Sequence, residues 1–220
     1  WAAVLLFDGK EVRLSGGHDL TTNNKMELTA TIEALMHINE KFLKAIKGKK
    51  NIVISTHSFP DADGIGSQIS LCLALRMNGA EVICCNDEKL LDRYKYLDPQ
   101  DVIHSVEEME TLFPQKPDLV IVVDTNTIKR TGKNFMKYYE DHECDILYID
   151  HHPCREEGGE DHCINTKAAA TGQLVGELID TALKMPFTQE MALPLYTAIL
   201  IDTSSFRYPT VTAGTHEIIA

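Results

Sequence analysis

Short runs of apolar, mostly β-branched residues alternate along this chain with stretches that carry a helical pattern. The runs that predict strands lie at 51–56, 81–85, 119–123 and 146–149, and the helical stretches lie at 64–78, 128–140 and 170–183. Alternation of this kind is typical of a mainly parallel sheet with helices on both faces, because parallel strands need long crossover connections. The sequence therefore predicts an α/β fold.

Acidic and histidine residues follow four apolar runs, the last of which, 191–201, also has the pattern of a buried strand. The four clusters are His57, Asp61 and Asp63; Asp124; Asp150, His151 and His152; and Asp202. Because the carboxyl ends of parallel strands meet at one edge of a sheet, we expect the clusters to gather there. Carboxylates so close together would repel one another without cations. The pattern predicts a two-metal hydrolase, and oxygen and imidazole donors suit Mn²⁺, Mg²⁺ or Zn²⁺.

Two arginines and a threonine accompany these clusters. Arg130 and Arg207 follow the second and fourth clusters and are candidate ligands for a substrate phosphate, although an ordinary surface arginine explains each of them equally well. Thr171 is expected to cap the helix that begins near Gly172, which is a structural role.

The order and wording of the clusters resemble the DHH phosphoesterase family, named after its Asp-His-His motif. Residues 51–210 are similar to the catalytic domain of that family. The segments THSFPDADGIGSQ, VVDTNTIKRTG, IDHHP, AAATGQLVGELI and AILIDTSSFRY are most similar to its nanoRNase and pAp phosphatase branch. The resemblance implies a phosphoesterase with two divalent cations, with Mn²⁺ favoured and Mg²⁺ or others as alternatives.

The same resemblance implies a role for each member of the clusters. It implies two cation sites that share one aspartate, the first formed by His57, Asp61 and Asp124 and the second by Asp63, Asp124, His151 and Asp202. His152 would face the substrate phosphate. Asp150 would orient the two histidines that follow it, as acids beside metal ligands commonly do.

The first 40 residues have a different pattern. Strands at 2–7 and 11–15 would form a hairpin around Asp8-Gly9, and a helical run follows at 26–38. With its TTNNKMEL sequence this segment resembles part of a type-1 ribonuclease H, in which Glu27 would be the catalytic glutamate and Asn24 would contact an RNA–DNA hybrid. Glu27 alone would not supply enough ligands for a two-metal site, so the alternatives are a fused ribonuclease H and a packing element.

Composition narrows the classes of function. The net charge of −12 disfavours broad binding to nucleic acid or membranes, which needs a positive surface, and so disfavours a long-range exonuclease. The sequence contains no apolar run near the roughly 20 residues that span a bilayer. The six cysteines form no CxxC pair, and we expect them to be reduced and mostly buried.

Together these features predict a cytoplasmic phosphohydrolase that acts on very short RNA or on 3′,5′-bisphosphoadenosine (pAp). The alternatives are a cyclic or linear dinucleotide phosphodiesterase, a ribonuclease H fusion protein, and a metal-binding module with little turnover. We predict a partial ribonuclease H-like segment at 1–40 and a DHH catalytic domain at 50–220. The resemblance also implies a C-terminal substrate-binding domain with a GGGH-type motif, which this sequence does not contain, and it allows a homodimer.

Overall fold

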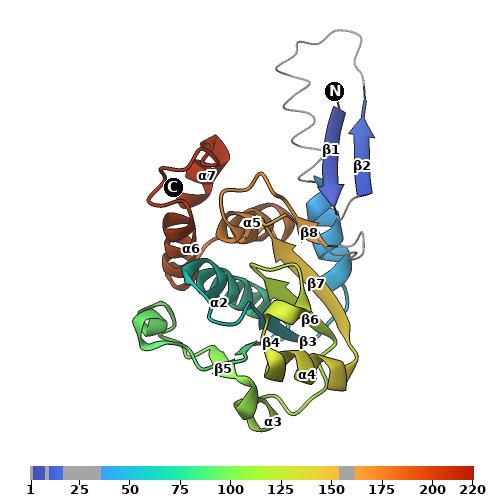
Figure 1. Ribbon diagram of the computed structural model, residues 1–220, viewed down its shortest axis with the longest axis vertical. Helices are drawn as coiled ribbons and strands as arrows, with labels where there is room; N and C mark the ends of the chain where they lie inside the picture. Colours follow the sequence, from blue (N-terminus) through green and yellow to red (C-terminus); the bar gives the residue numbers. More distant parts are fainter. Residues whose placement is uncertain (1, 8–9, 17–35, 154–161) are drawn as a thin grey trace.

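The computed structural model describes residues 2–7, 10–16, 36–153 and 162–220 (Figure 1). Six strands form one sheet in the order β5-β4-β3-β6-β7-β8. They are β3 (Asn51–Ser55), β4 (Glu81–Asn86), β5 (Ile103–Ser105), β6 (Leu119–Val123), β7 (Asp145–Asp150) and β8 (Cys163–Ile164). Each neighbouring pair in this sheet is parallel, which confirms the predicted α/β fold.

The strand order reverses between β3 and β6. From β3 the chain moves outward through β4 to β5, and from β6 it moves outward in the other direction through β7 to β8. Open α/β sheets bind ligands outside the carboxyl ends of the strands at such a reversal. His57 and Asp61 follow β3, and Asp124 follows β6, so these residues flank the reversal.

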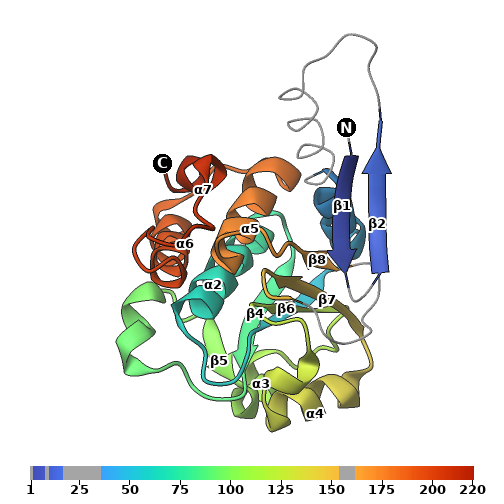
Figure 2. The ribbon, with the colours of Figure 1, turned by 45° about the horizontal axis from the view of Figure 1, so that its top comes forward.

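Helices cover both faces of the sheet (Figures 1 and 2). One face packs against α2 (Ala62–Met77), α5 (Thr171–Glu177), α6 (Gln189–Asp202) and the helix at 36–46, and the other packs against α3 (Met109–Leu112) and α4 (Lys133–His142). Successive residues of strand β3 point to opposite faces, so Ile52 and Ile54 pack in the core on the first face and Val53 packs in the core on the second. The remaining elements are η1 (Asp92–Leu97), η2 (Val106–Glu108), η3 (Ile128–Arg130), the π-helical turn η4 (Leu178–Ala182) and α7 (Ala213–Ile219).

Helix α2 lies between the sheet and α6 and is buried along most of its length. Oδ1 of Asp61 accepts hydrogen bonds from the amides of Asp63 (2.9 Å) and Gly64 (3.4 Å), and this cap starts the helix. Gly66 lies so close to the carbonyl oxygen of Pro194 in α6 that a side chain would not fit there. The helix begins before the predicted residue 64, so Asp63 belongs to its first turn.

The run 191–201 was predicted as a strand, and that prediction is wrong. These residues belong to α6, and Asp202 is its last residue. Leu193, Tyr196 and Ile201 are exposed while Leu195 and Ile199 are buried, so α6 is apolar on both sides and carries no amphipathic period. Asp202 therefore reaches the edge of the sheet from a helix.

Two predicted helices are interrupted. The stretch 128–140 divides into η3 and α4, which are separated at Gly132, where φ is 102°. The stretch 170–183 begins as α5 and continues as the π-helical turn η4. Both predicted stretches are thus mainly helical, but the first omits Thr131 and Gly132 and ends at His142, and the second runs from Thr171 to Ala182.

Strands β1 (Ala2–Phe7) and β2 (Lys10–Ser15) form the predicted antiparallel hairpin, with Phe7 opposite Lys10. In both views it stands beside the β8 end of the larger sheet (Figures 1 and 2). Asn24 and Glu27 fall outside the described residues. No helix within the described ranges combines the length and apolar character that crossing a membrane requires.

Candidate metal centre

Donor atoms gather in overlapping groups at the carboxyl ends of β3, β6 and β7. The groups are His57, Asp61 and Asp124, here called the His57 group; Asp63, His151 and Asp202, here called the Asp63 group; and Asp124, His151 and His152. Within each group, one donor atom from every residue lies within 4.8 Å of the others. The structure thus brings together all four clusters found in the sequence, and each group could hold a metal ion.

Asp124 lies between the two named groups, and its two carboxylate oxygens face different histidines. Oδ2 is 3.5 Å from Nε2 of His57, and Oδ1 is 3.9 Å from Nε2 of His151. Asp124 is buried, and its φ of 60° falls in the left-handed region, which Asp tolerates better than most residues. One carboxylate could therefore serve both groups.

Asp63 is fixed by the start of α5. The amides of Thr171 and Gly172 donate to its Oδ2 and Oδ1, both at 2.8 Å. These bonds hold the Asp63 side chain in place without a cation, in a buried position beside other acids.

Burial, reinforced by the negative charges of Asp124 and Asp202, raises the pKa of Asp63 well above its ordinary value. Burial also raises the pKa of Asp202, and the raising effect of Asp124 opposes the lowering effect of His151. A cation among these carboxylates would favour their ionised forms. Their surroundings are those of ligands whose charge a cation offsets.

His151 has one satisfied and one unsatisfied ring nitrogen. Nδ1 contacts the carbonyl oxygen of Ala168 at 3.4 Å. Nε2 is buried, has no hydrogen-bond partner among the described residues, and lies 3.4 Å from Oδ2 of Asp202 and 3.8 Å from Oδ2 of Asp63. Buried polar atoms are normally paired, so an unpaired nitrogen facing carboxylates fits a metal ligand.

Nε2 of His57 faces Oδ2 of Asp124 at 3.5 Å, while its Nδ1 contacts the carbonyl oxygen of Ser58 at 2.9 Å. Burial lowers the pKa of His57, but its hydrogen bond with Asp124, the Ser58 carbonyl and the charge of Asp61 together raise that pKa above the usual value. Both histidines therefore direct Nε2 towards Asp124 and use Nδ1 to fix the ring.

His152 lies at the open side of the site, with 44% of its side chain exposed. Oδ1 of the fully buried Asp150 accepts hydrogen bonds from Nδ1 (2.8 Å) and the amide (3.1 Å) of His152. The hydrogen bond to Asp150 raises the pKa of His152. Asp150 thus orients His152, while the backbone at Ala168 contacts His151.

Two further residues support these carboxylates. Nδ2 of Asn126 donates to Oδ2 of Asp150 at 2.7 Å and to the carbonyl oxygen of His152 at 3.2 Å. The hydroxyl of Thr171 donates to Oδ1 of Asp124 at 3.0 Å. The expected capping role of Thr171 is wrong, because Ala170 is the N-cap of α5. The sequence offered one signal for Asn126, its position two residues after Asp124.

The two candidate phosphate ligands lie at the rim, and both are exposed. Arg130 ends η3, and its positive charge acts against protonation of His152, so it lies near that ring. Arg207 donates to the carbonyl (2.7 Å) and hydroxyl (3.1 Å) oxygens of Ser204, which keeps its guanidinium against its own turn. The charge of Arg130 thus acts on a histidine of the site, whereas the guanidinium of Arg207 is hydrogen-bonded to Ser204.

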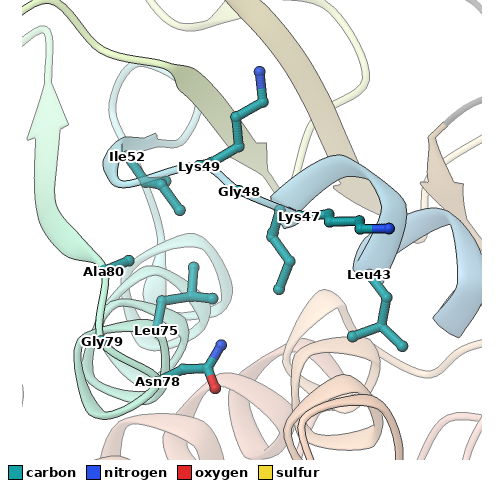
Figure 3. A pocket seen from close by; sticks show the side chains of 10 residues that line it. Leu43, Lys47, Gly48, Lys49, Ile52, Leu75, Asn78, Gly79 and Ala80 are labelled. Atoms are coloured by element: carbon teal, nitrogen blue, oxygen red, sulfur yellow. The ribbon is translucent and has the colours of Figure 1, made fainter.

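A separate cavity of about 330 Å³ lies near the amino end of β3, at the opposite edge of the sheet (Figure 3). Leu43, Ile52 and Leu75 line it from three different elements. The amine of Lys49 turns away from it to Asp145, 2.5 Å from Oδ2. The residues that line this cavity include no acid or histidine, so it lacks the groups that phosphoester chemistry requires.

Comparison with known families agrees with this geometry. Residues 51–199 match the model of the DHH family, N-terminal domain. The chain belongs to the DHH family. The bifunctional oligoribonuclease and PAP phosphatase NrnA of Thermus thermophilus is 31% identical over 190 residues, which are 84% of this chain and 52% of that protein. The chain thus spans about half the length of the curated relatives it matches.

Two other comparisons agree with the fold and with the N-terminal resemblance. A solved exopolyphosphatase-related protein from Bacteroides fragilis superposes with a TM-score of 0.71 at 24% identity, covering 84% of this chain and 55% of that one, and so shows the same fold. The ribonuclease H of Nitratidesulfovibrio vulgaris is 60% identical over 40 residues, 18% of this chain and 26% of that protein. Ribonuclease H proteins are therefore also among its relatives, in line with the TTNNKMEL motif.

Proposed function

We propose that this chain is the catalytic part of a phosphohydrolase that uses two divalent cations to cleave phosphoester bonds in very short oligoribonucleotides or in pAp. The observation that carries the proposal is Asp124, whose two oxygens face the histidines of two adjacent donor groups. The Thermus thermophilus relative is named as a bifunctional oligoribonuclease and PAP phosphatase, which supports the substrate class.

The donors fit two hard cations. In this proposal His57, Asp61 and Asp124 hold the first cation, and Asp63, Asp124, His151 and Asp202 hold the second. All donors are carboxylate oxygens or imidazole nitrogens, which suit Mn²⁺ and Mg²⁺. The groups contain no thiolate, which is the ligand that softer metals prefer. Cations held there would lower the pKa of a water molecule and offset negative charge on the phosphate.

His152 supplies what the carboxylates cannot, a positively charged donor at the open side of the site. Asp150 occupies its Nδ1, which leaves Nε2 for the substrate. Because Asp150 raises the pKa of His152, the protonated ring is favoured, and Nε2–H can donate to a phosphate oxygen or to the leaving oxygen. Asn126 completes this arrangement by holding the second oxygen of Asp150.

We also propose the division of the chain into a DHH catalytic domain at 50–220 and a ribonuclease H-like segment at 1–40. Cleavage of an RNA–DNA hybrid that is lost on Glu27→Gln would give the segment an activity of its own. Hybrid cleavage that is absent, or unchanged by Glu27→Gln, would leave the segment without this role.

The direct test is Mn²⁺-dependent release of mononucleotide from pAp and from 5′-labelled RNAs of two to five nucleotides. Asp124→Ala removes the shared carboxylate, and Asp141→Asn on the exposed side of α4 is the matched control. Release by the wild-type chain and by Asp141→Asn, but not by Asp124→Ala, is the expected result. Release that survives in Asp124→Ala contradicts the proposal, and so does a wild-type chain that binds metal without releasing product.

A further inference from the structure

Phe59 combines high exposure with a position on the loop that joins two residues of the candidate metal centre. Phe59 is 79% exposed, which is the highest exposed fraction among the large hydrophobic residues that the structure describes. It lies on the loop between His57 and Asp61, two members of the His57 group. Single exposed hydrophobic residues are ordinary in proteins, so exposure alone assigns no role.

The backbone of Phe59 makes this position unusual. Its φ is 52°, a value that is rare for a bulky residue. Phe59 also precedes Pro60, and proline disfavours helical and favours extended backbone in the residue before it. Glycine or asparagine would meet the backbone requirement with less strain, and strained residues of this kind cluster at ligand sites. A large aromatic ring at this strained position therefore points to a function of the ring itself.

The loop that carries the ring is tied down on both sides. The amide of Ser58 donates to the carbonyl oxygen of Arg130 at 2.6 Å. On the other side, Asp61 is fixed as the cap of α2. The ring is thus presented from a loop whose backbone is hydrogen-bonded to that of Arg130.

The backbone that carries the ring is also close to two donor residues of the site. Phe59 is two positions from His57 and two from Asp61, so its Cα lies at most about 7 Å from the Cα of each. A nucleobase joined through its ribose to a phosphate at the metal groups would lie near such a ring. Aromatic side chains bind bases by stacking on their faces, which tolerates any base.

We propose that Phe59 is the platform on which a nucleobase of the substrate stacks, so that it selects nucleotides over phosphates that carry no base. This inference rests on the proposed function, because it assumes that the substrate phosphate binds at the two donor groups. It places part of the substrate specificity within this chain.

The test compares a 5′-phosphorylated adenylyl dinucleotide with the same backbone made abasic at both positions. Loss of one stacked base predicts that Phe59→Ala raises KM for the dinucleotide about 5- to 150-fold. The kcat for the dinucleotide should change by no more than about twofold, and KM for the abasic substrate should not change. Phe59→Trp should keep the wild-type KM. Phe187→Ala, at the opposite end of α6 from Asp202, is the matched control and should behave as wild type.

Equal KM values for wild type and Phe59→Ala, or an equal rise in KM for both substrates, would overturn the inference. A second measurement separates its failure from that of the proposed function. In Phe59→Trp with Trp1→Phe, AMP added with Mg²⁺ should quench the remaining tryptophan. Quenching by a protein that hydrolyses neither substrate would reject the proposed function and support the platform. Absence of quenching would reject the platform whatever the activity.

Discussion

The two donor groups differ in how their acids are held. Asp63 is fully buried, and two backbone amides of α5 fix both its oxygens. Asp61 is exposed, and one of its oxygens caps α2 through the amides of Asp63 and Gly64. The Asp63 group is thus preorganised but electrostatically unfavourable without a cation, whereas the His57 group uses a carboxylate that also stabilises a helix.

Because the acids are held differently, substituting a donor residue can affect the protein in two ways. Replacing Asp63 changes mainly the charge in a buried site. Replacing Asp61 changes both a donor and a helix cap. Asp124 is a member of the His57 group and also faces His151 of the Asp63 group, and His152 lies beside Asp124, so variants at these four positions separate the contributions.

The largest effect is expected at Asp124. Asp124→Asn removes the charge shared by both groups and also alters the acceptor for Thr171, so both cation sites should weaken together. We expect kcat/KM to fall by about 10⁴-fold or more, as for residues that act as a unit. Calorimetric titration with Mn²⁺ should show the loss of both binding events. Loss of a single event would mean that the groups are independent.

His152 should separate chemistry from cation binding. His152→Gln keeps both donor groups intact, and we expect kcat to fall by about 10²- to 10³-fold with an unchanged Mn²⁺ stoichiometry. Asn126→Ala, which acts through Asp150, should give a smaller loss of about 10- to 100-fold. A variant of His152 that loses a cation would show that this residue is a ligand.

The buried acids predict how the metal-free protein responds to pH. Because burial and neighbouring carboxylates raise the pKa of Asp63, the native state keeps a proton that the unfolded chain releases above about pH 3.9. Stability in EDTA should therefore fall as the pH rises from about 4 towards the raised pKa. The raised pKa values of His57 and His152 extend this fall above about pH 6.5, where the unfolded histidines lose their protons.

Urea unfolding midpoints in EDTA, measured between about pH 4.5 and 8, check this prediction. Asp63→Asn should flatten the acidic part of the profile because it removes the titrating group. A metal-free wild-type protein that becomes more stable across this range would show that the Asp63 group is not strained by its charges.

Asp61 should show the dual role directly. Without metal, Asp61→Ala loses the cap of α2 and should lower the free energy of unfolding by about 1 kcal/mol, whereas Asp61→Asn keeps a capping oxygen and should be nearly neutral. Both variants should lose activity in Mn²⁺. Equal stability of the two variants without metal would show that the cap contributes nothing.

The smallest effect is expected in the turn after Asp202. Ser204, Ser205 and Phe206 have φ values of 50°, 63° and 62°, which is an unfavourable series for residues other than glycine. Ser205→Gly should raise the free energy of unfolding by about 0.5–1 kcal/mol and leave activity unchanged, because it relieves strain without touching a donor. Thermal unfolding and the Mn²⁺-dependent assay check both parts. Lost activity would mean that Ser205 positions Asp202.

Much of this fold could be predicted from local sequence patterns. The strands at 51–55 and 119–123 are short and mainly apolar, as expected of strands buried on both faces, and His57 and Asp124 follow within two residues of their ends. Because parallel strands point the same way, residues that follow them had to share one edge of the sheet. Strands β5 and β8, with three and two residues, are too short to carry a pattern.

Other features depend on tertiary contacts that no local pattern encodes. Helix α6 is apolar towards α2 and also towards solvent, so its period was hidden and Asp202 was placed after a strand. Thr171 has the residue type and position of a cap, yet its hydroxyl bonds to Asp124, 47 residues earlier in the chain. Asn126 likewise meets Asp150 only because β6 and β7 are neighbours.

Anomalous diffraction from crystals of the chain grown with Mn²⁺ tests the central claim most directly. The account predicts two manganese peaks about 3.5–4 Å apart, one beside each carboxylate oxygen of Asp124. The first should lie among His57, Asp61 and Asp124, and the second among Asp63, His151 and Asp202. A single peak, or peaks that leave Asp124 unligated, would contradict the claim that one aspartate joins two cation sites.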